Sequence, residues 1–117
     1  MTTYDVCAAD DVAAGQMLAA RAGMTPVVLI RTSAGKLHGL VDRCIHQGGP
    51  LSRGRLQPAT VGDRPGEYRE DDGQAIVKCP WHGFEFDVAT GCALFDARRR
   101  VRPLRVREES GRVLVEA

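Results

Sequence analysis

The sequence predicts an all-β fold, a small antiparallel barrel or sandwich. Short apolar runs recur along its 117 residues, glycine-bearing turn signals separate them, and no repeat or low-complexity segment interrupts the pattern. Strand runs at this spacing are typical of small antiparallel barrels and sandwiches. A chain of this size has room for one modest core, so we expect a single domain over residues 1–117.

Three pairs of apolar runs flank short turns and predict three β-hairpins. In chain order the pairs are Val27–Thr32 with Leu37–Asp42, Phe84–Asp87 with Cys92–Phe95, and Leu104–Arg107 with Arg112–Glu116. Near the N-terminus, Ala9–Gly15 is the helix candidate, which Asp10 or Asp11 could cap. The expected elements are therefore mostly strands, with one short helix.

The segment from Ser52 to Gly73, "SRGRLQPATVGDRPGEYREDDG", departs from this pattern. Glycine, proline and charged residues occur throughout it, so the segment is too polar to belong to a core. We expect a long surface loop, about residues 52–73, between two ordered halves.

Composition argues against several classes of function. The formal net charge is +1, which supplies no overall field for nucleic acid or an anionic membrane. No apolar run approaches the roughly 20 residues of a spanning helix, and the opening "MTTYDVCAADDVAAGQ" lacks the pattern of a secretory signal. The expected location is cytoplasmic, where the four cysteines are better explained as metal ligands or thiols than as disulfides.

Two short arms of the sequence each combine cysteine with histidine. Cys44 and His46 form C-x-H in "DRCIHQGGPLS", and Cys79 and His82 form C-x-x-H in "KCPWHGFEFD". Glycine follows each pair, where a strand is expected to run into a turn. Two thiolates and two imidazoles make a complete four-ligand set for one metal centre.

The residues alone leave two metals open. Zinc accepts two Cys and two His, but its usual spacing pairs Cys with Cys and His with His. One Cys and one His on each arm instead suits a two-iron cluster, with both thiolates on one iron and both imidazoles on the other. A zinc-binding structural or interaction module is the alternative, and chance coincidence of ordinary cysteines and histidines is the third explanation.

The segments "CIHQGGPLSRG" and "CPWHGFEFDVATG" resemble the two cluster-binding loops of Rieske-type [2Fe–2S] proteins, especially low-potential, oxygenase-associated ferredoxins. The flanking strands also fit, so the resemblance covers about residues 27–117. It implies one Rieske [2Fe–2S] cluster, held between two loops at one end of a small all-β protein. It also implies that Cys44 and Cys79 bind the inner iron and that His46 and His82 bind the outer iron, near the surface.

The chain departs from the family by its spacing, since 32 residues, 47–78, separate the two arms. The expected surface loop absorbs the surplus at little cost in closure entropy. The resemblance also bears on the reduction potential. Family members with high potentials place hydroxyls where Phe84 and Phe86 stand and carry an extra disulfide, which Trp81 excludes here. We therefore expect a low potential, roughly −150 mV.

The resemblance implies an electron-transfer component rather than an enzyme. A soluble ferredoxin of this type takes one electron from a flavin-dependent reductase and passes it to a Rieske-type oxygenase, docking at its His46/His82 tip. The apolar rim of that tip would comprise Pro50, Leu51, Trp81 and Phe84. The sequence contains no catalytic nucleophile–base pair or phosphate loop, so no small-molecule substrate is expected. Small Rieske subunits of assimilatory nitrite reductases have similar length and loops and are the alternative.

Other reactive or charged residues have simpler explanations. Cys7 and Cys92 are expected to be small apolar fillers or thiols, and His38 an ordinary histidine in a strand. Seven of the fourteen arginines fall within residues 98–112, interleaved with glutamates. A solvated strand face accounts for them; a docking patch for an acidic redox partner is the alternative.

Overall fold

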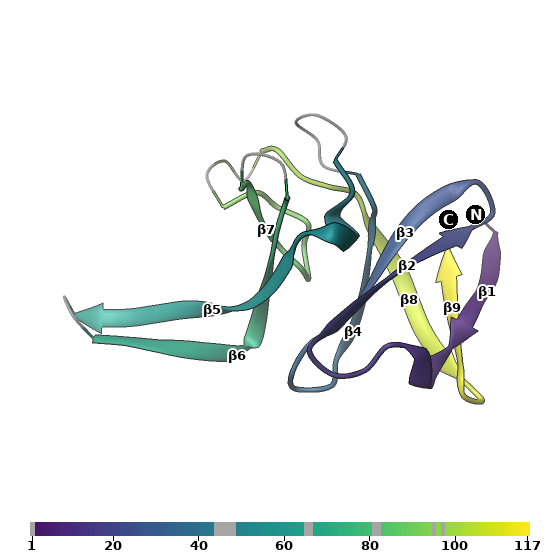
Figure 1. Cartoon of the computed structure of the whole chain (residues 1–117), viewed down its shortest axis with the longest axis horizontal. Helices are drawn as coiled ribbons and strands as arrows, with labels where there is room; N and C mark the ends of the chain where they lie inside the picture. Colours follow the sequence, from purple (N-terminus) through teal and green to yellow (C-terminus); the bar gives the residue numbers. More distant parts are fainter. Residues whose placement is uncertain (1, 44–48, 65–66, 81–82, 95, 97) are drawn as a thin grey trace.

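The described part of the chain forms nine strands and two short 3₁₀ helices, which confirms the predicted all-β class (Figure 1). This computed structural model describes residues 2–43, 49–64, 67–80, 83–94, 96 and 98–117, with the backbone alone for 58–64 and 67–74. The elements are β1 (Thr3–Ala8), η1 (Ala9–Asp11), β2 (Gln16–Ala22), β3 (Thr25–Arg31), β4 (Leu37–Val41), η2 (Leu51–Arg53), β5 (Arg55–Arg64), β6 (Glu67–Lys78), β7 (Glu85–Asp87), β8 (Pro103–Glu109) and β9 (Arg112–Glu116).

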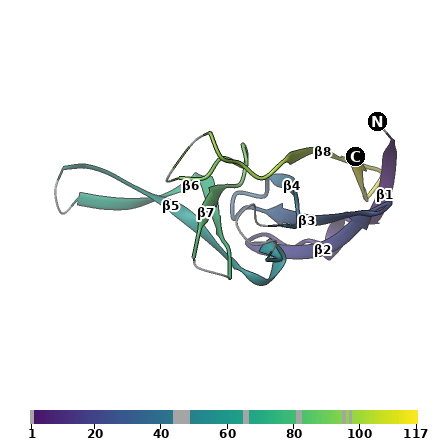
Figure 2. The same cartoon turned by 90° about the horizontal axis from the view of Figure 1, so that it is seen from above.

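Six strands form one curved antiparallel sheet in the order β1-β9-β8-β4-β3-β2. The sheet curls until its two edge strands, β1 and β2, approach each other, giving an open barrel (Figures 1 and 2). The chain ends lie side by side, because the backbones of Thr2 and Ala117 exchange hydrogen bonds of 3.1 and 3.0 Å. We call this part of the molecule the barrel.

The remaining three strands form a small sheet in the order β5-β6-β7. Strand β7 pairs only with the C-terminal end of β6, through Val77 opposite Phe86. The other ends of β5 and β6 continue as a two-stranded ribbon that projects away from the barrel (Figures 1 and 2). The small sheet therefore has a packed end, beside β7, and a projecting end.

Strand β3 joins two hydrophobic cores because both of its faces are buried. Successive side chains of a strand point to opposite faces. Val27 and Leu29 belong to a core inside the barrel, together with Val113 and Val115. Val28 and Ile30, which alternate with them along β3, face the opposite side of the sheet. The second core lies between the barrel and the small sheet and comprises Val28, Ile30, Leu40, Leu51, Val77, Cys79, Phe86, Val88, Ala93 and Val101. The continuous apolar run of β3 thus attaches the small sheet to the barrel.

Two of the three predicted hairpins form as expected, β3–β4 and β8–β9. Ser110 and Gly111, with φ of 51° and 77°, make the two-residue turn between β8 and β9. The middle hairpin is shorter than predicted, since β7 is matched only by an isolated bridge between Phe86 and Ala93. The predicted helix at Ala9–Gly15 shortens to the 3₁₀ turn η1.

The predicted long surface loop at 52–73 is wrong, because most of this segment is paired β-structure. Strands β5 and β6 pair antiparallel from Arg55 opposite Lys78 out to Arg64 opposite Glu67. Polar residues are no obstacle in a ribbon that projects into solvent, and backbone pairing with β6 outweighs weak strand propensity. The register shifts after Pro58, where proline has no N–H to donate to the ladder.

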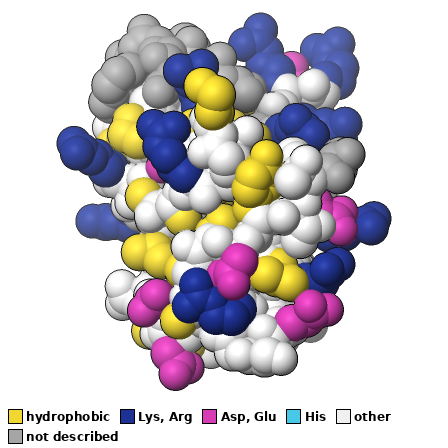
Figure 3. Space-filling view, turned by 90° about the vertical axis from the view of Figure 1, so that its right-hand side faces the viewer, with side chains coloured by type: hydrophobic (Ala, Val, Ile, Leu, Met, Phe, Trp, Pro, Cys, Tyr) yellow, Lys and Arg dark blue, Asp and Glu magenta, His cyan; other side chains and the backbone are white. Residues whose placement is uncertain are grey.

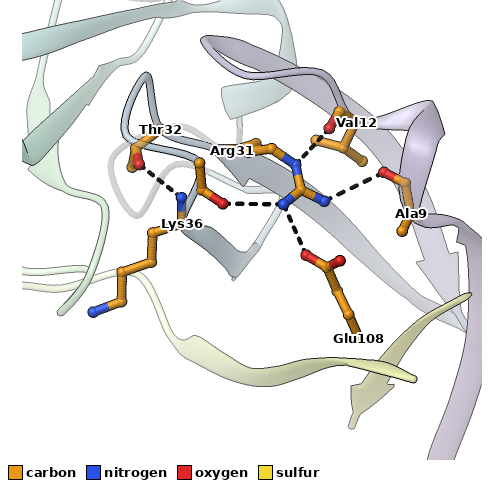
Figure 4. A network of polar contacts seen from close by, with 7 residues as sticks. Ala9, Val12, Arg31, Thr32, Lys36 and Glu108 are labelled. Carbon is orange, nitrogen blue, oxygen red and sulfur yellow. Dashed lines mark hydrogen bonds and ion pairs between the residues drawn. The ribbon is translucent and has the colours of Figure 1, made fainter. Parts of the chain in front are cut away.

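In the barrel, the side chain of Arg31 links β3 to the segment around η1, to the β3–β4 turn and to β8 (Figure 4). Its guanidinium donates to the carbonyls of Val12 at 2.6 Å, Gly35 at 3.0 Å and Ala9 at 3.3 Å. It also forms an ion pair of 2.8 Å with Glu108 of β8. A planar group with five donors suits this role, since it satisfies several carbonyls at once.

Candidate functional site

Of the four predicted ligands, the structure describes Cys79. Cys44, His46 and His82 lie outside the described residues, as does Trp81. Within the described ranges, no three His, Cys, Asp or Glu side chains gather as a metal site. The site is therefore approached from Cys79 and from the residues that begin and end the two arms.

The second arm begins at Cys79, directly after β6, and its ends are closed by a short hydrogen bond. The Cys79 N–H donates to the carbonyl of Phe84 at 2.7 Å, so the arm leaves the sheet and returns within a few residues. Gly83 has a φ of 70°, a left-handed conformation that favours glycine. Cys79 is 2% exposed and packs in the core between the barrel and the small sheet.

The first arm, residues 43–51, is also closed at its ends. The Asp42 carboxylate accepts hydrogen bonds from the Ser52 N–H at 2.8 Å and from the Ser52 hydroxyl at 2.6 Å. Leu51 has no exposed surface and lies in the same core as Cys79. The predicted place of Leu51 on an exposed apolar rim is wrong, because its side chain fills the core where the arm rejoins the fold.

The two arms meet where Gly54 crosses the end of β6. A Cβ on Gly54 would overlap the carbonyl oxygen of Lys78, so only glycine permits this close backbone approach. Immediately afterwards, Arg55 pairs with Lys78 and begins the small sheet. The backbone that follows the first arm thus contacts Lys78, the residue just before Cys79 and the second arm.

This arrangement fits a metal held between the arms. Both arms start and end on fixed hydrogen bonds, and Cys79 places a sulfur donor in apolar surroundings at their junction. Phe86 is fully buried and Phe84 packs against the same core. Neither phenylalanine has a hydroxyl to donate to a sulfur, which is the basis of the predicted low potential.

Shallow depressions lie on the two sides of Gly83. One, of about 390 Å³, is lined by Gly83, Phe84, Glu85 and Leu94. Leu94 is half exposed, so this depression has an apolar wall. Sequence reasoning placed Leu94 in a strand but gave no sign that its side chain faces solvent, since one apolar residue in a short run can face either way.

The other depression, of about 470 Å³, is basic and reaches Cys79. Its lining residues are Arg53, Gly54, Arg55, Lys78, Cys79, Pro80 and Gly83. The three cations come from η2, from the start of β5 and from the end of β6, and all three are exposed. Sequence reasoning missed this cluster because its members are up to 25 residues apart, as Arg53 and Lys78 show.

The other cysteines and His38 lie away from the arms. Cys7 is on β1 beside the barrel core, and burial, with the nearby Asp11 carboxylate, raises the pKa of its thiol. Cys92 is half-buried after the β7 turn, and neither forms a disulfide. His38 lies on β4, where burial and the charge of Lys36 lower its pKa.

The arginines of 98–112 include several that are paired with acids. Arg105 and Arg107 form ion pairs with Glu116, and Arg112 forms one with Asp5. Arg98 is bonded to Asp96. These partners support the solvated strand face over the docking patch for this stretch. No helix in the described part of the chain is long and apolar enough to cross a membrane.

Comparisons with known proteins place these features in context. The family described as "Rieske [2Fe-2S] domain" matches residues 2–105. Apoptosis-inducing factor 3 of mouse and human is 33% identical over 86 residues, and the match spans 74% of this chain but only 11% of theirs. The 3-phenylpropionate/cinnamic acid dioxygenase ferredoxin subunit of Escherichia coli K12 is 32% identical over 94 residues, 80% of this chain and 73% of that subunit.

Solved structures resemble the whole fold. The putative NADH-dependent nitrite reductase small subunit of Mycobacterium tuberculosis has a TM-score of 0.76 and 26% identity, covering 97% of this chain and 93% of that one. A complex of reduced oxygenase and oxidised ferredoxin in carbazole 1,9a-dioxygenase contains a chain with a TM-score of 0.71 and 25% identity, covering 97% and 91%.

Proposed function

We propose that this chain, which belongs to the Rieske [2Fe–2S] family and holds one Rieske cluster, is a one-electron carrier. The carrier takes an electron from a flavin-dependent reductase and delivers it to a Rieske-type oxygenase. The observation that carries the proposal is the 32% identity to a dioxygenase ferredoxin subunit over 73% of that subunit's length. It is supported by the ferredoxin complexed with its oxygenase among the similar structures.

The proposed ligands are the four residues of the two arms. Cys44 and Cys79 bind the inner iron, and His46 and His82 bind the outer iron, closer to the surface. The buried position of Cys79 between two closed arms supports its part of this assignment. When bound, the cluster supplies a one-electron couple. The chain itself contributes the fixed ends of the arms, the apolar surroundings of Cys79 and a surface on which a partner can dock.

A direct test of the cofactor and its ligands combines metal analysis with one variant. The purified protein should contain two iron and two sulfide per chain and no zinc, in the ratio that a Rieske cluster requires. His82→Ala should abolish the Rieske absorption and its low-g electron paramagnetic resonance signal. His38→Ala is the matched control and should retain both. One zinc per chain without colour would instead establish the zinc-binding module.

The carrier function is tested by reconstituted turnover. A flavin reductase, NADH and a Rieske oxygenase should form product only when this protein is added, and His82→Ala should not support turnover. The second candidate is the small subunit of a nitrite reductase, favoured by the 26% identity and TM-score of 0.76 to the M. tuberculosis subunit. Stimulation of a sirohaem nitrite reductase, with no effect on oxygenase turnover, would establish that alternative.

A further inference from the structure

We infer that Arg53, Arg55 and Lys78, here called the basic wall, form a docking surface for an acidic face of the redox partner. This inference rests on the proposed carrier function and adds the charge and the contact surface of the partner. The basic wall surrounds the depression that reaches Cys79, so a protein bound there would lie directly over the entry to the second arm.

The basic wall has no acidic partner among the side chains that the structure describes. Among the described side chains, no carboxylate lies within the 4.0 Å of an ion pair from any of these three cations. Glu85 is the nearest acid by register, since it stands opposite Lys78 on β7. Its carboxylate instead accepts a hydrogen bond of 2.8 Å from the Gln57 amide. The three charges are therefore left for solvent or for a partner.

The pairing of the strands places like charges together at a cost. Arg55 and Lys78 stand directly opposite each other on antiparallel strands. Like charges in this position destabilise a sheet. Glu85 stands on the other side of Lys78, but its carboxylate is hydrogen-bonded to Gln57 and forms no ion pair with Lys78. The repulsion is therefore at most partly offset, as expected when charges serve binding rather than stability.

The side chain of Lys78 lies against the second arm. A Cβ built on Gly83 would lie 3.0 Å from Cε and 3.8 Å from Nζ of Lys78, so the lysine side chain lies over this glycine. On the other side of Gly83 are Phe84, Glu85 and the half-exposed Leu94. The docking face thus combines a basic half with a smaller half that has two apolar side chains and one carboxylate, which Gln57 binds, a mixture typical of transient protein interfaces.

The charge distribution of the molecule favours an acidic protein over a polyanion. The net charge is only +1, so the chain as a whole does not attract nucleic acid or an anionic membrane. Figure 3 shows the barrel end of the molecule, where Lys and Arg side chains occur in both halves and acidic side chains lie mostly in the lower half. A local cationic surface on a nearly neutral protein steers an acidic patch of similar size.

The test uses the double variant Arg55→Glu/Lys78→Glu with two haem proteins as probes. Acidic cytochrome b5 and basic cytochrome c accept electrons from the reduced protein in stopped-flow mixing. At an ionic strength of 10 mM, where the Debye length is about 30 Å, charge reversal should slow electron transfer to cytochrome b5 by about 10-fold or more and speed transfer to cytochrome c. The difference should shrink toward 1 M salt, where the Debye length is about 3 Å.

The matched control is Arg21→Glu/Lys36→Glu, which reverses two exposed cations of the barrel outside the depression. It makes the same change in net charge and should alter both rates by less than about 3-fold. Binding is measured separately, by calorimetric titration of oxidised protein with oxidised cytochrome b5. The wall variant should weaken this affinity by about 10-fold and the control should not.

The outcomes separate the two proposals. If the reduced, cluster-loaded protein transfers no electron to either cytochrome, the carrier function is wrong, and the calorimetric affinity still decides the docking surface. If both cytochromes are reduced but the wall and control variants behave alike in rate and affinity, the docking surface is wrong and the carrier function stands. Binding of phosphatidylserine vesicles that depends on the wall, without wall-dependent binding of cytochrome b5, would also overturn the inference.

Discussion

The barrel and the cluster-arm end use their charged residues differently. In the barrel, Arg31 binds three backbone carbonyls and Glu108, and Arg112 binds Asp5 at 2.9 Å. At the arms, Arg55 and Lys78 face each other with no acidic partner among the described side chains. Paired charges stabilise the fold, whereas unpaired charges of one sign contribute an electric field for a partner. This difference between the barrel and the arm end is the basis of the proposed docking surface.

The largest effect is expected from replacing a cysteine at the arm end, Cys79, and comparing the result with replacement of a cysteine in the barrel, Cys7. Cys79→Ser should abolish cluster assembly, because Cys79 is the proposed inner-iron ligand and is buried in the core between the barrel and the small sheet. Cys7→Ser changes the same group on β1 of the barrel and should retain the full visible spectrum. Iron and sulfide analysis of both variants, expressed side by side, provides the measurement. A Cys79→Ser protein with an unchanged spectrum would contradict the proposed ligand set.

A second comparison separates the two cores. Phe86 is fully buried between the small sheet and the barrel, and Leu29 is fully buried inside the barrel. Phe86→Ala should lower the free energy of unfolding by about 3–5 kcal/mol, and Leu29→Ala by about 2–5 kcal/mol. Because Phe86 shares its core with Cys79, only its variant should also lose the cluster faster below the unfolding transition. Cluster bleaching and far-ultraviolet circular dichroism, followed together on heating, distinguish these effects.

Equal bleaching rates in variants of equal stability would show that cluster retention depends on global stability alone. That result would remove the distinction between the two cores. Matching the variants for unfolding temperature, for example with Phe86→Leu in place of Phe86→Ala, makes the comparison a fair one.

The parts of the fold that sequence predicted correctly are those fixed by local signals. The β3–β4 and β8–β9 hairpins each carry a glycine at a positive φ, Gly35 at 91° and Gly111 at 77°. Strand β1 was missed because its partner is β9, at the far end of the chain, so no local pattern indicates the pairing. The β5–β6 ribbon was missed for a different reason. Its sequence is rich in glycine, proline and charged residues, which signal turns and loops, and the pairing of β5 and β6 with each other and of β6 with β7 defines the strands.

The candidate site divides in the same way. The ligand motifs are contiguous and could be identified from residue types and spacing. The basic wall could not, since Arg53, Arg55 and Lys78 become neighbours only when β5 pairs with β6. Sequence instead drew attention to the arginine-rich stretch at 98–112, several members of which the structure pairs with acids. Local density of charge is a poor guide to a patch that tertiary structure assembles.

The contrast between paired and unpaired charges predicts a smaller difference in stability, between a variant of Arg31 and a variant of Arg55. Arg31→Ala should lower the free energy of unfolding by about 2–4 kcal/mol, because it leaves several carbonyls and Glu108 without their charged donor. Arg55→Ala should change it by less than about 0.5 kcal/mol, since it removes only a repulsion with Lys78. Urea denaturation of both variants at low and high salt measures the difference. A large loss in Arg55→Ala would show that the wall is structural.

The smallest expected effect concerns His38, which lies on β4 between the two parts of the molecule. Burial, and then the charge of Lys36, lower its pKa below the ordinary 6.5, with Asp87 opposing them. Above pH 6.5 His38 is neutral in both states and contributes a constant term. As the pH falls below 6.5, the unfolded chain binds this proton first, so the stability of the fold decreases until the pH passes the pKa of the folded state.

His38→Gln should therefore flatten the loss of stability on the acid side of pH 6.5 without changing stability at pH 7.5. Urea midpoints at half-unit steps from pH 5 to pH 7.5 measure the slope, and the difference between variant and parent cancels the other titrating groups. Nuclear magnetic resonance titration of the His38 ring gives the folded pKa directly. Lys36→Gln serves as the intermediate case, because it removes one cause of the shift and leaves burial in place. If stability fell with pH at the same slope in all three proteins, His38 would titrate in the folded protein as it does in the unfolded chain. In that case β4 would be more open to water than its packing implies.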